Sequence, residues 1–464
     1  MEPTSQITRS PMRESRRSRH LLFRSPSTEK MLTAQTAAAD AMPVHDPPLD
    51  PHDEAVFLLN IAAEVEHALM VQYLFAAYSL RDPSQFSDDK GALVRTWRDA
   101  IATVAREEMG HLVTIQNLLR SLGAPLSLAR DEFPVNTGFY PFAFRLEPLS
   151  KNSAAKYAFA EMPSIAAAEG IAGVTAAEIA DITQRADEDN TGQPVNRVGK
   201  LYEQLRTVVQ SLPTTDFSSS SVSQQARFDE WGLGKHDLLI LPVGTRSQAL
   251  AALGQIAEQG EGPVTAAAAA DPASHFQRFV SIYRRIPDGG SWQPAYRIIE
   301  DPNVRSSVIG LDNPGQISQP EARLWAQLFN ARYRRLLMTL RHALELESPA
   351  PTGLNSTPRG LLISWTFSEM YHLRSIASIL VTLPATGTAG DTHVAGPPFE
   401  LPSSLSLPML EADRWRLQTS MLQSAEMIVA SLAALPATRG TDFLKGMSAA
   451  DAEAVQIANR VASQ

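Results

Sequence analysis

The helical stripe within residues 91–122 constrains the fold more than any other feature of this sequence. Apolar side chains recur there at the three- and four-residue spacing of one helix face, and the pattern stops before Pro125. Two members of the stripe, Glu108 and His111, are polar, and the spacing places both on the buried face. The full stripe is Trp97, Ile101, Val104, Glu108, His111, Ile115, Leu118 and Leu122.

A carboxylate on a buried face is costly unless it is paired or binds a metal ion. Glu108 and His111 are three residues apart, so they lie one turn apart and can bind one cation together. A second helix, expected over 53–80, places Glu66 on its own apolar stripe. We therefore predict that Glu66, Glu108 and His111 bind metal. We expect Glu107 to be a solvated neighbour of Arg106.

Two sets of residues could complete such a site. Glu203 is the only acid in a third helix expected over 195–212, although its helical neighbours look solvent-exposed. Glu261 and His275 flank a break in a fourth helical region, which stops after 259 and resumes at 274. The alternative is the Glu-x-x-His pair of Glu369 and His372, which has the cleaner spacing. The residues alone leave both sets open.

The rest of the chain also reads as helical, and no segment alternates with period two for long. We expect an all-α protein with long loops, one of which, 125–150, is rich in proline and aromatic residues. Residues 1–50 are rich in arginine and serine and are expected to be a disordered tail. The remaining helices are expected over 151–161, 175–187, 247–259, 274–285, 320–347, 358–383 and 408–434.

Composition limits the chemistry. The chain has no cysteine, which excludes disulfides, thiolate zinc sites, iron–sulfur clusters and thiolate-bound haem. Histidine and carboxylate ligands suit iron, manganese or zinc. The net charge of -9 leaves no basic footprint for nucleic acid. We see neither a membrane-spanning run nor a secretory signal, and we expect a cytoplasmic protein with no membrane partner.

Several segments together resemble the iminophenyl-pyruvate dimer synthase family, whose best-known members act in bisindole biosynthesis of the violacein and rebeccamycin type. The likeness covers roughly residues 53–434. It is carried by Glu64-Val65-Glu66-His67-Ala68, Ala105-Arg106-Glu107-Glu108-Met109-Gly110-His111-Leu112, Gly199-Lys200-Leu201-Tyr202-Glu203, Gln259-Gly260-Glu261-Gly262, Ser274-His275-Phe276-Gln277-Arg278-Phe279 and Ala395-Gly396-Pro397-Pro398-Phe399-Glu400-Leu401.

The resemblance implies a ferritin-like four-helix bundle with long loops and additional C-terminal helices. In such di-iron proteins two helices carry Glu-x-x-His units and the other two carry one further Glu each. The bundle is expected to close before about residue 290, which favours Glu203, Glu261 and His275 as the second half of the site. The expected division is a tail over 1–50, a ferritin-like metal-binding domain over 51–290, and a C-terminal helical region over 291–464 packed on the bundle.

These features predict a non-haem iron oxidoreductase with two iron ions per chain. Its substrates would be dioxygen or peroxide and a small aromatic or amino-acid-derived molecule of secondary metabolism. Aromatic residues within 131–148 could line the substrate entrance or simply pack the loop. A ferroxidase or iron-binding protein, a haem-dependent oxidase and a metal-free helical scaffold are the alternatives, and a homo-oligomer is compatible with each.

Overall fold

The computed structural model describes residues 42–43, 45–171, 173–231, 238–261, 273–306, 313–346, 357–401 and 405–463. Most of the tail predicted over 1–50 lies outside these residues. Within them the secondary structure is helical, and the only β pairing consists of isolated bridges. The predicted all-α class is confirmed.

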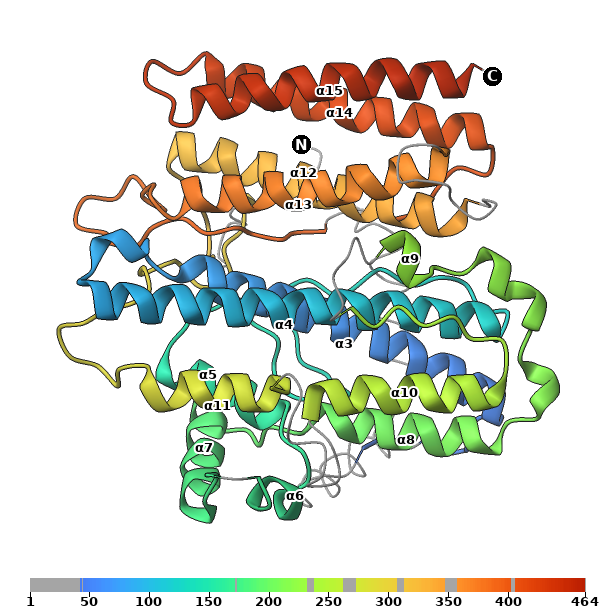
Figure 1. Ribbon diagram of the computed structural model, residues 1–464. Helices are drawn as coiled ribbons and strands as arrows, with labels where there is room; N and C mark the ends of the chain where they lie inside the picture. Colours follow the sequence, from blue (N-terminus) through green and yellow to red (C-terminus); the bar gives the residue numbers. More distant parts are fainter. Residues whose placement is uncertain are drawn as a thin grey trace, which may run out of the picture.

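Two long helices form the centre of the molecule (Figure 1). Helix α3 spans Pro51–Ser79 and α4 spans Asp88–Ser121, and the two pack against each other as an antiparallel pair. Asp50 caps α3 by accepting a hydrogen bond from the backbone N–H of His52, and Pro51 occupies the first helical position, where its missing N–H costs nothing. Between them, the short η1 helix spans Pro83–Gln85.

The other two positions of the bundle are each filled by a split helix. One comprises α5 (Lys151–Ala160) and α8 (Val198–Ser211), and the other comprises α10 (Arg246–Glu261) and α11 (His275–Arg285). Figure 1 shows α11 and α10 end to end, with α5 against α11 and α8 against α10. Four helix ends therefore meet in the middle of the bundle.

Shorter elements connect these pieces. Helices α6 (Ile165–Glu169) and α7 (Ala176–Asp189) lie between α5 and α8 in the chain, and α7 packs on α5. The segment before α10 contains η2 (Thr214–Asp216), η3 (Ser219–Gln224) and α9 (Phe228–Trp231). The third bundle helix was expected over 195–212 alone, and α5, which was expected as a short helix over 151–161, was not assigned to the bundle.

The C-terminal residues add two layers of paired helices above α3 and α4 in Figure 1. Helices α12 (Pro320–Glu345) and α13 (Pro358–Leu380) pack together, and α14 (Glu411–Ala433) packs on α12 and on α15 (Thr441–Ala462). A hydrogen bond between His67 and the Tyr333 hydroxyl joins α3 to α12. Helix α15 was not predicted. A domain boundary near residue 290 stays a prediction.

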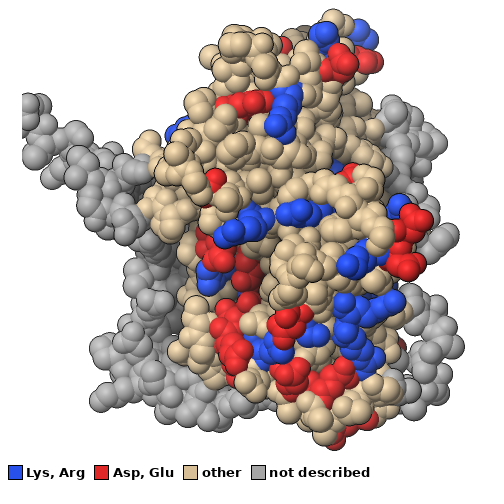
Figure 2. Space-filling view, turned by 90° about the vertical axis from the view of Figure 1, so that its left-hand side faces the viewer, with Lys and Arg blue, Asp and Glu red and all other residues tan. Residues whose placement is uncertain are grey.

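The surface is mixed in charge on the face drawn in Figure 2, where acidic and basic side chains are interspersed. Among the described residues, no helix is both long and apolar enough to cross a membrane.

Candidate metal centre

The first group of potential ligands comes from the middle of α3 and α4. Glu66, Glu108 and His111 are each at most 2% exposed. His111 Nδ1 lies 2.7 Å from Glu108 Oε2 and 3.3 Å from Glu66 Oε2. The stripe on α4 turns Glu108 and His111 inward together, and α3 supplies Glu66 opposite them.

A second group shares Glu108 with the first. His275 Nδ1 lies 3.0 Å from Glu108 Oε1 and 3.4 Å from Glu161 Oε2. In each group the three candidate ligand atoms lie within 4.8 Å of one another, and all the residues are buried. Glu108 therefore presents one oxygen to each imidazole, as a carboxylate that bridges two cations would.

The split helices position the second group. Glu161 is the C-terminal capping residue of α5, and His275 is the first residue of α11. A capping box between Ser274 and Gln277 fixes that first turn of α11. The end of α10 passes close by, because a Cβ atom on Gly260 would lie 3.2 Å from Glu161 Oε2.

The second ring nitrogen of each imidazole, Nε2, points away from the carboxylates of the two groups and has its own hydrogen-bond partner. His275 Nε2 lies 3.0 Å from Glu107 Oε2, and His111 Nε2 lies 2.8 Å from Gln259 Oε1. Each partner atom is an acceptor, so each Nε2 carries the hydrogen and each Nδ1 turns its lone pair toward the carboxylates. Such an arrangement repels itself unless a metal cation or a proton lies between each imidazole and the carboxylates.

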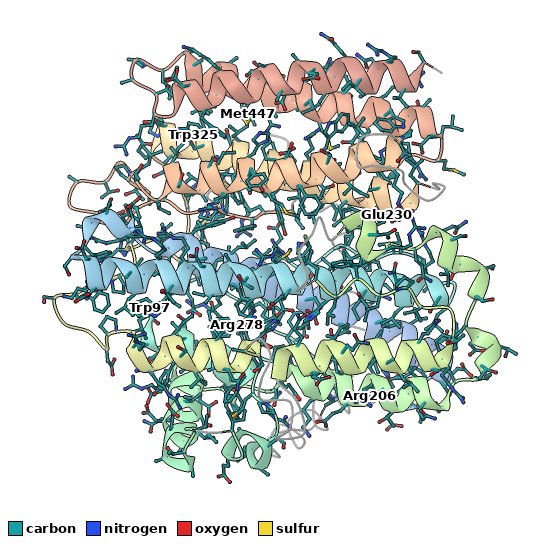
Figure 3. All side chains as sticks on the ribbon, viewed as in Figure 1. Trp97, Arg206, Glu230, Arg278, Trp325 and Met447 are labelled. Carbon is teal, nitrogen blue, oxygen red and sulfur yellow. The ribbon has the colours of Figure 1, made fainter. Side chains whose placement is uncertain are left out.

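Glu107 corrects one expectation from the sequence. It was expected to be solvated beside Arg106, but it is fully buried and also accepts a hydrogen bond from Arg278. Figure 3 labels Arg278, which lies between α11 and α4. Glu107 lies one position before Glu108 on α4, and α11 covers that side of the helix because α11 packs against α4.

Two tyrosines bind the outer carboxylates, which are those of Glu66 and Glu161, on either side of the shared Glu108. The Tyr202 hydroxyl donates to Glu66 Oε1, and the Tyr73 hydroxyl donates to Glu161 Oε1 at 2.5 Å. The second oxygen of Glu66 and Nδ1 of His275 are buried without a hydrogen-bond partner. Unpartnered buried oxygen and nitrogen atoms that converge on one place fit an iron ion, which accepts both donor types.

The pKa values of the site residues reflect the crowding of charge among them. Burial, reinforced by the facing Glu108, raises the pKa of Glu66 to about 8. Burial opposes ionisation of Glu108, but His275 and His111 outweigh it and hold the pKa of Glu108 well below its usual range. Burial would lower the pKa of His111, yet Glu108 and Glu66 raise it to about 10. Without a metal ion, the protonated His111 imidazole therefore balances the ionised Glu108, and Glu66 is protonated near pH 7.

The structure brings four predicted ligands together and leaves two outside both groups. Glu66, Glu108, His111 and His275 converge, whereas Glu203 is exposed and pairs with Lys200 at 3.0 Å. Glu261 lies beside the site, where burial raises its pKa to about 7 and its Oε1 is 3.8 Å from Arg197 Nη1.

The alternative pair lies elsewhere. Glu369 is fully buried between Arg335 and Arg332, with His372 Nδ1 at 3.5 Å, and belongs to neither group. Sequence reasoning missed Glu161. The available signal was an acid directly before Met162-Pro163, at the point where a short helix has to end.

The residues flanking Glu66 have structural partners. Glu64 accepts a hydrogen bond from the Tyr140 hydroxyl at 2.9 Å, and His67 bonds to the Leu128 carbonyl at 2.9 Å as well as to Tyr333. The loop aromatics that could have lined an entrance are buried within the loop packing. They are Phe139, Tyr140, Phe142 and Phe144.

Comparison with known proteins agrees with the fold. The family model described as ferritin-like matches residues 59–284, the span that holds both ligand groups. These residues therefore form a ferritin-like domain. A solved ferritin-like protein from Caulobacter vibrioides is similar over 69% of this chain and 95% of its own, with 18% identity and a TM-score of 0.42.

Two curated enzymes are related to this chain. It is 26% identical to dichlorochromopyrrolate synthase from Lentzea aerocolonigenes over 398 residues, which cover 76% of this chain and 36% of that enzyme. It is also 26% identical to 2-imino-3-(indol-3-yl)propanoate dimerase from Chromobacterium violaceum over 388 residues, 74% of this chain and 33% of that enzyme. The chain thus spans about a third of the length of these relatives, and the predicted relationship to enzymes of this type is confirmed.

Proposed function

We propose that the protein is a non-haem di-iron oxidoreductase that oxidises a small aromatic or amino-acid-derived substrate with dioxygen or peroxide. The observation that carries the proposal is the shared carboxylate, because Glu108 faces His111 with one oxygen and His275 with the other. Two cations side by side, each with one imidazole and one further carboxylate, would satisfy this arrangement.

The donor set supports iron. One position would be held by Glu66, Glu108 and His111, and the other by Glu108, Glu161 and His275. Three protein ligands to each ion leave coordination positions open, as catalytic metal sites require. Bound iron would supply electrons to dioxygen or peroxide, which the side chains cannot do.

The protein would contribute orientation and exclusion of water. Glu107 and Gln259 fix the tautomers of the two imidazoles, so Nδ1 of each is ready to bind a cation. Tyr73 and Tyr202 fix the outer carboxylates. The surrounding bundle is apolar, and this raises the strength of each of these interactions.

The substrate class rests on the relatives. The names of both enzymes describe synthesis or dimerisation, one of them of an indole-bearing imino acid. Because this chain spans about a third of either enzyme, only the coarse class is carried over: a small aromatic or amino-acid-derived molecule of secondary metabolism.

The test is metal analysis of the purified protein with an absorption spectrum, beside the double variant Glu108→Ala/His111→Ala. We expect about two irons per chain in the parent protein, a large loss in the variant, and a lower melting temperature after chelation, because a ligand that binds only the native state stabilises it. A Soret band would replace the proposal with haem chemistry. Absence of metal from both proteins would leave a helical scaffold.

A further inference from the structure

The two imidazoles of the candidate metal centre are supported by different chemical groups. Behind His275 stands the carboxylate of Glu107, with Oε2 at 3.0 Å from Nε2. Behind His111 stands the amide oxygen of Gln259, at 2.8 Å from Nε2. In other respects the two halves match, since each has one imidazole, a share of Glu108, and one carboxylate held by a tyrosine.

This difference changes what each imidazole can donate. A hydrogen bond from an imidazole N–H to a carboxylate is stronger than one to a neutral amide, and it raises the electron density on the opposite ring nitrogen. Burial sharpens the contrast, because Glu107 is fully buried and a low local dielectric strengthens the bond. His275 is therefore the stronger ligand of the two.

Arg278 reduces this contrast without removing it. It donates to the same oxygen of Glu107 that His275 uses, and because a guanidinium can only donate, that oxygen is an acceptor. The other oxygen of Glu107 is buried without a hydrogen-bond partner, so the carboxylate makes no further bond that would draw charge from His275.

We propose that the two metal positions are unequal, and that Glu107 and Gln259 set the inequality as positioning residues. The position of Glu161 and His275 takes up iron first and more tightly, and the position of Glu66 and His111 is filled second. The inference rests on the proposed function, because it assumes that both groups bind metal.

The test is anaerobic titration of metal-free protein with Fe(II), followed by calorimetry and by Mössbauer spectroscopy of samples loaded with one and two equivalents of ⁵⁷Fe. We expect two resolved binding steps and one dominant quadrupole doublet at one equivalent. Glu107→Gln should weaken the first step by roughly 10–100-fold, the usual cost of losing such a partner, and should alter the doublet that appears first.

The reciprocal variant is Gln259→Glu, which gives His111 the kind of partner that His275 has. It should strengthen the second step and bring the two steps together. Glu203→Gln removes an exposed carboxylate and should leave both steps unchanged. If Glu107→Gln unfolds the protein, Gln259→Glu still decides the question.

The outcomes separate this inference from the proposed function. Failure of the parent protein to bind Fe(II) would refute the di-iron proposal and this inference with it. Two bound irons with equal affinities, or two steps that neither variant changes, would keep the di-iron proposal and overturn the inequality.

Discussion

Glu161 and Glu203 are the two acids that could serve as the metal ligand from the third bundle helix. They differ in how readily the sequence pattern identifies them. Glu203 lies inside a fourteen-residue helix, where helical spacing can be counted. Glu161 caps a ten-residue helix and belongs to no stripe that could mark it. At the residue scale, however, burial decides which of the two is the candidate ligand, since Glu161 is 3% exposed and Glu203 has an exposed side chain.

This difference gives a direct comparison of two conservative variants. Glu161→Gln should lower iron content, because it removes one negative ligand from the Glu108 and His275 group. Glu203→Gln should keep the iron content of the parent protein. The measurement is iron per chain after identical purification. The reverse result would move the third carboxylate to Glu203, as the sequence suggested.

At the scale of elements, the two split helices explain how the site is assembled. Helix α8 approaches the end of α10 so closely that a Cβ atom on Gly199 would lie 1.5 Å from Glu261 Oε1. A methyl group at this position would therefore displace the Glu261 carboxylate, which is the end of a flexible side chain beside the candidate metal centre.

We predict that Gly199→Ala destabilises the protein by about 1 kcal/mol at most, the usual cost of pushing a flexible side chain off its rotamer, because the Glu261 carboxylate can turn away. Urea unfolding measures the change. The double variant Gly199→Ala/Glu261→Ala should recover most of the loss, because the atom that clashes is gone. Additive losses in the double variant would mean that the strain comes from some other neighbour of Gly199.

The helices were predictable from the sequence where they carry a strong apolar stripe, and the site was predictable where it lies on them. Helix α4 was expected over 91–122 and starts three residues earlier, and its Glu108 and His111 both reach the candidate site. Helix α15 was missed because small residues such as Ala454 and Ala458 fill its buried face. The contacts between α5 and α11 depend on long-range packing, which local periodicity does not encode.

At the scale of the whole molecule, the same Glu-x-x-His spacing serves two purposes. In α4 the pair of Glu108 and His111 faces other carboxylates and a second histidine, which is an environment that calls for a cation. In α13 the equivalent Glu369 faces guanidinium groups that already neutralise it. What surrounds the pair, and not the spacing, decides which chemistry it can perform.

The α13 pair belongs to a buried ion network that ties the C-terminal helices together. Arg332 on α12 binds Glu369 of α13 at 3.2 Å and also binds Asp451 of α15. Arg335 on α12 binds the same carboxylate. Removing one member of such a network leaves the others buried without a partner, which is costly. The network thus links α15, in the outermost layer, through α12 to α13.

This network predicts a dependence of stability on pH. Burial opposes ionisation of Glu369, but Arg335 and Arg332 overcome it and lower its pKa from 4.5 to about 2. A depressed pKa stabilises the fold above the unfolded value of 4.5, and the contribution is lost as the pH falls toward 2. We expect Glu369→Gln to lower the free energy of unfolding by about 3 kcal/mol at pH 7.

The difference between the parent protein and Glu369→Gln should shrink steadily as the pH is lowered from about 5 toward 2, because protonation then neutralises the parent carboxylate as the substitution does. Urea unfolding at several pH values measures it, with Asp442→Asn as the control at a fully exposed carboxylate. A difference that stays constant over that range would mean that Glu369 contributes through packing and not through its charge. In that case the arginines of α12 would have to be neutralised by another group, and Asp451, which also binds Arg332, is the residue to substitute next.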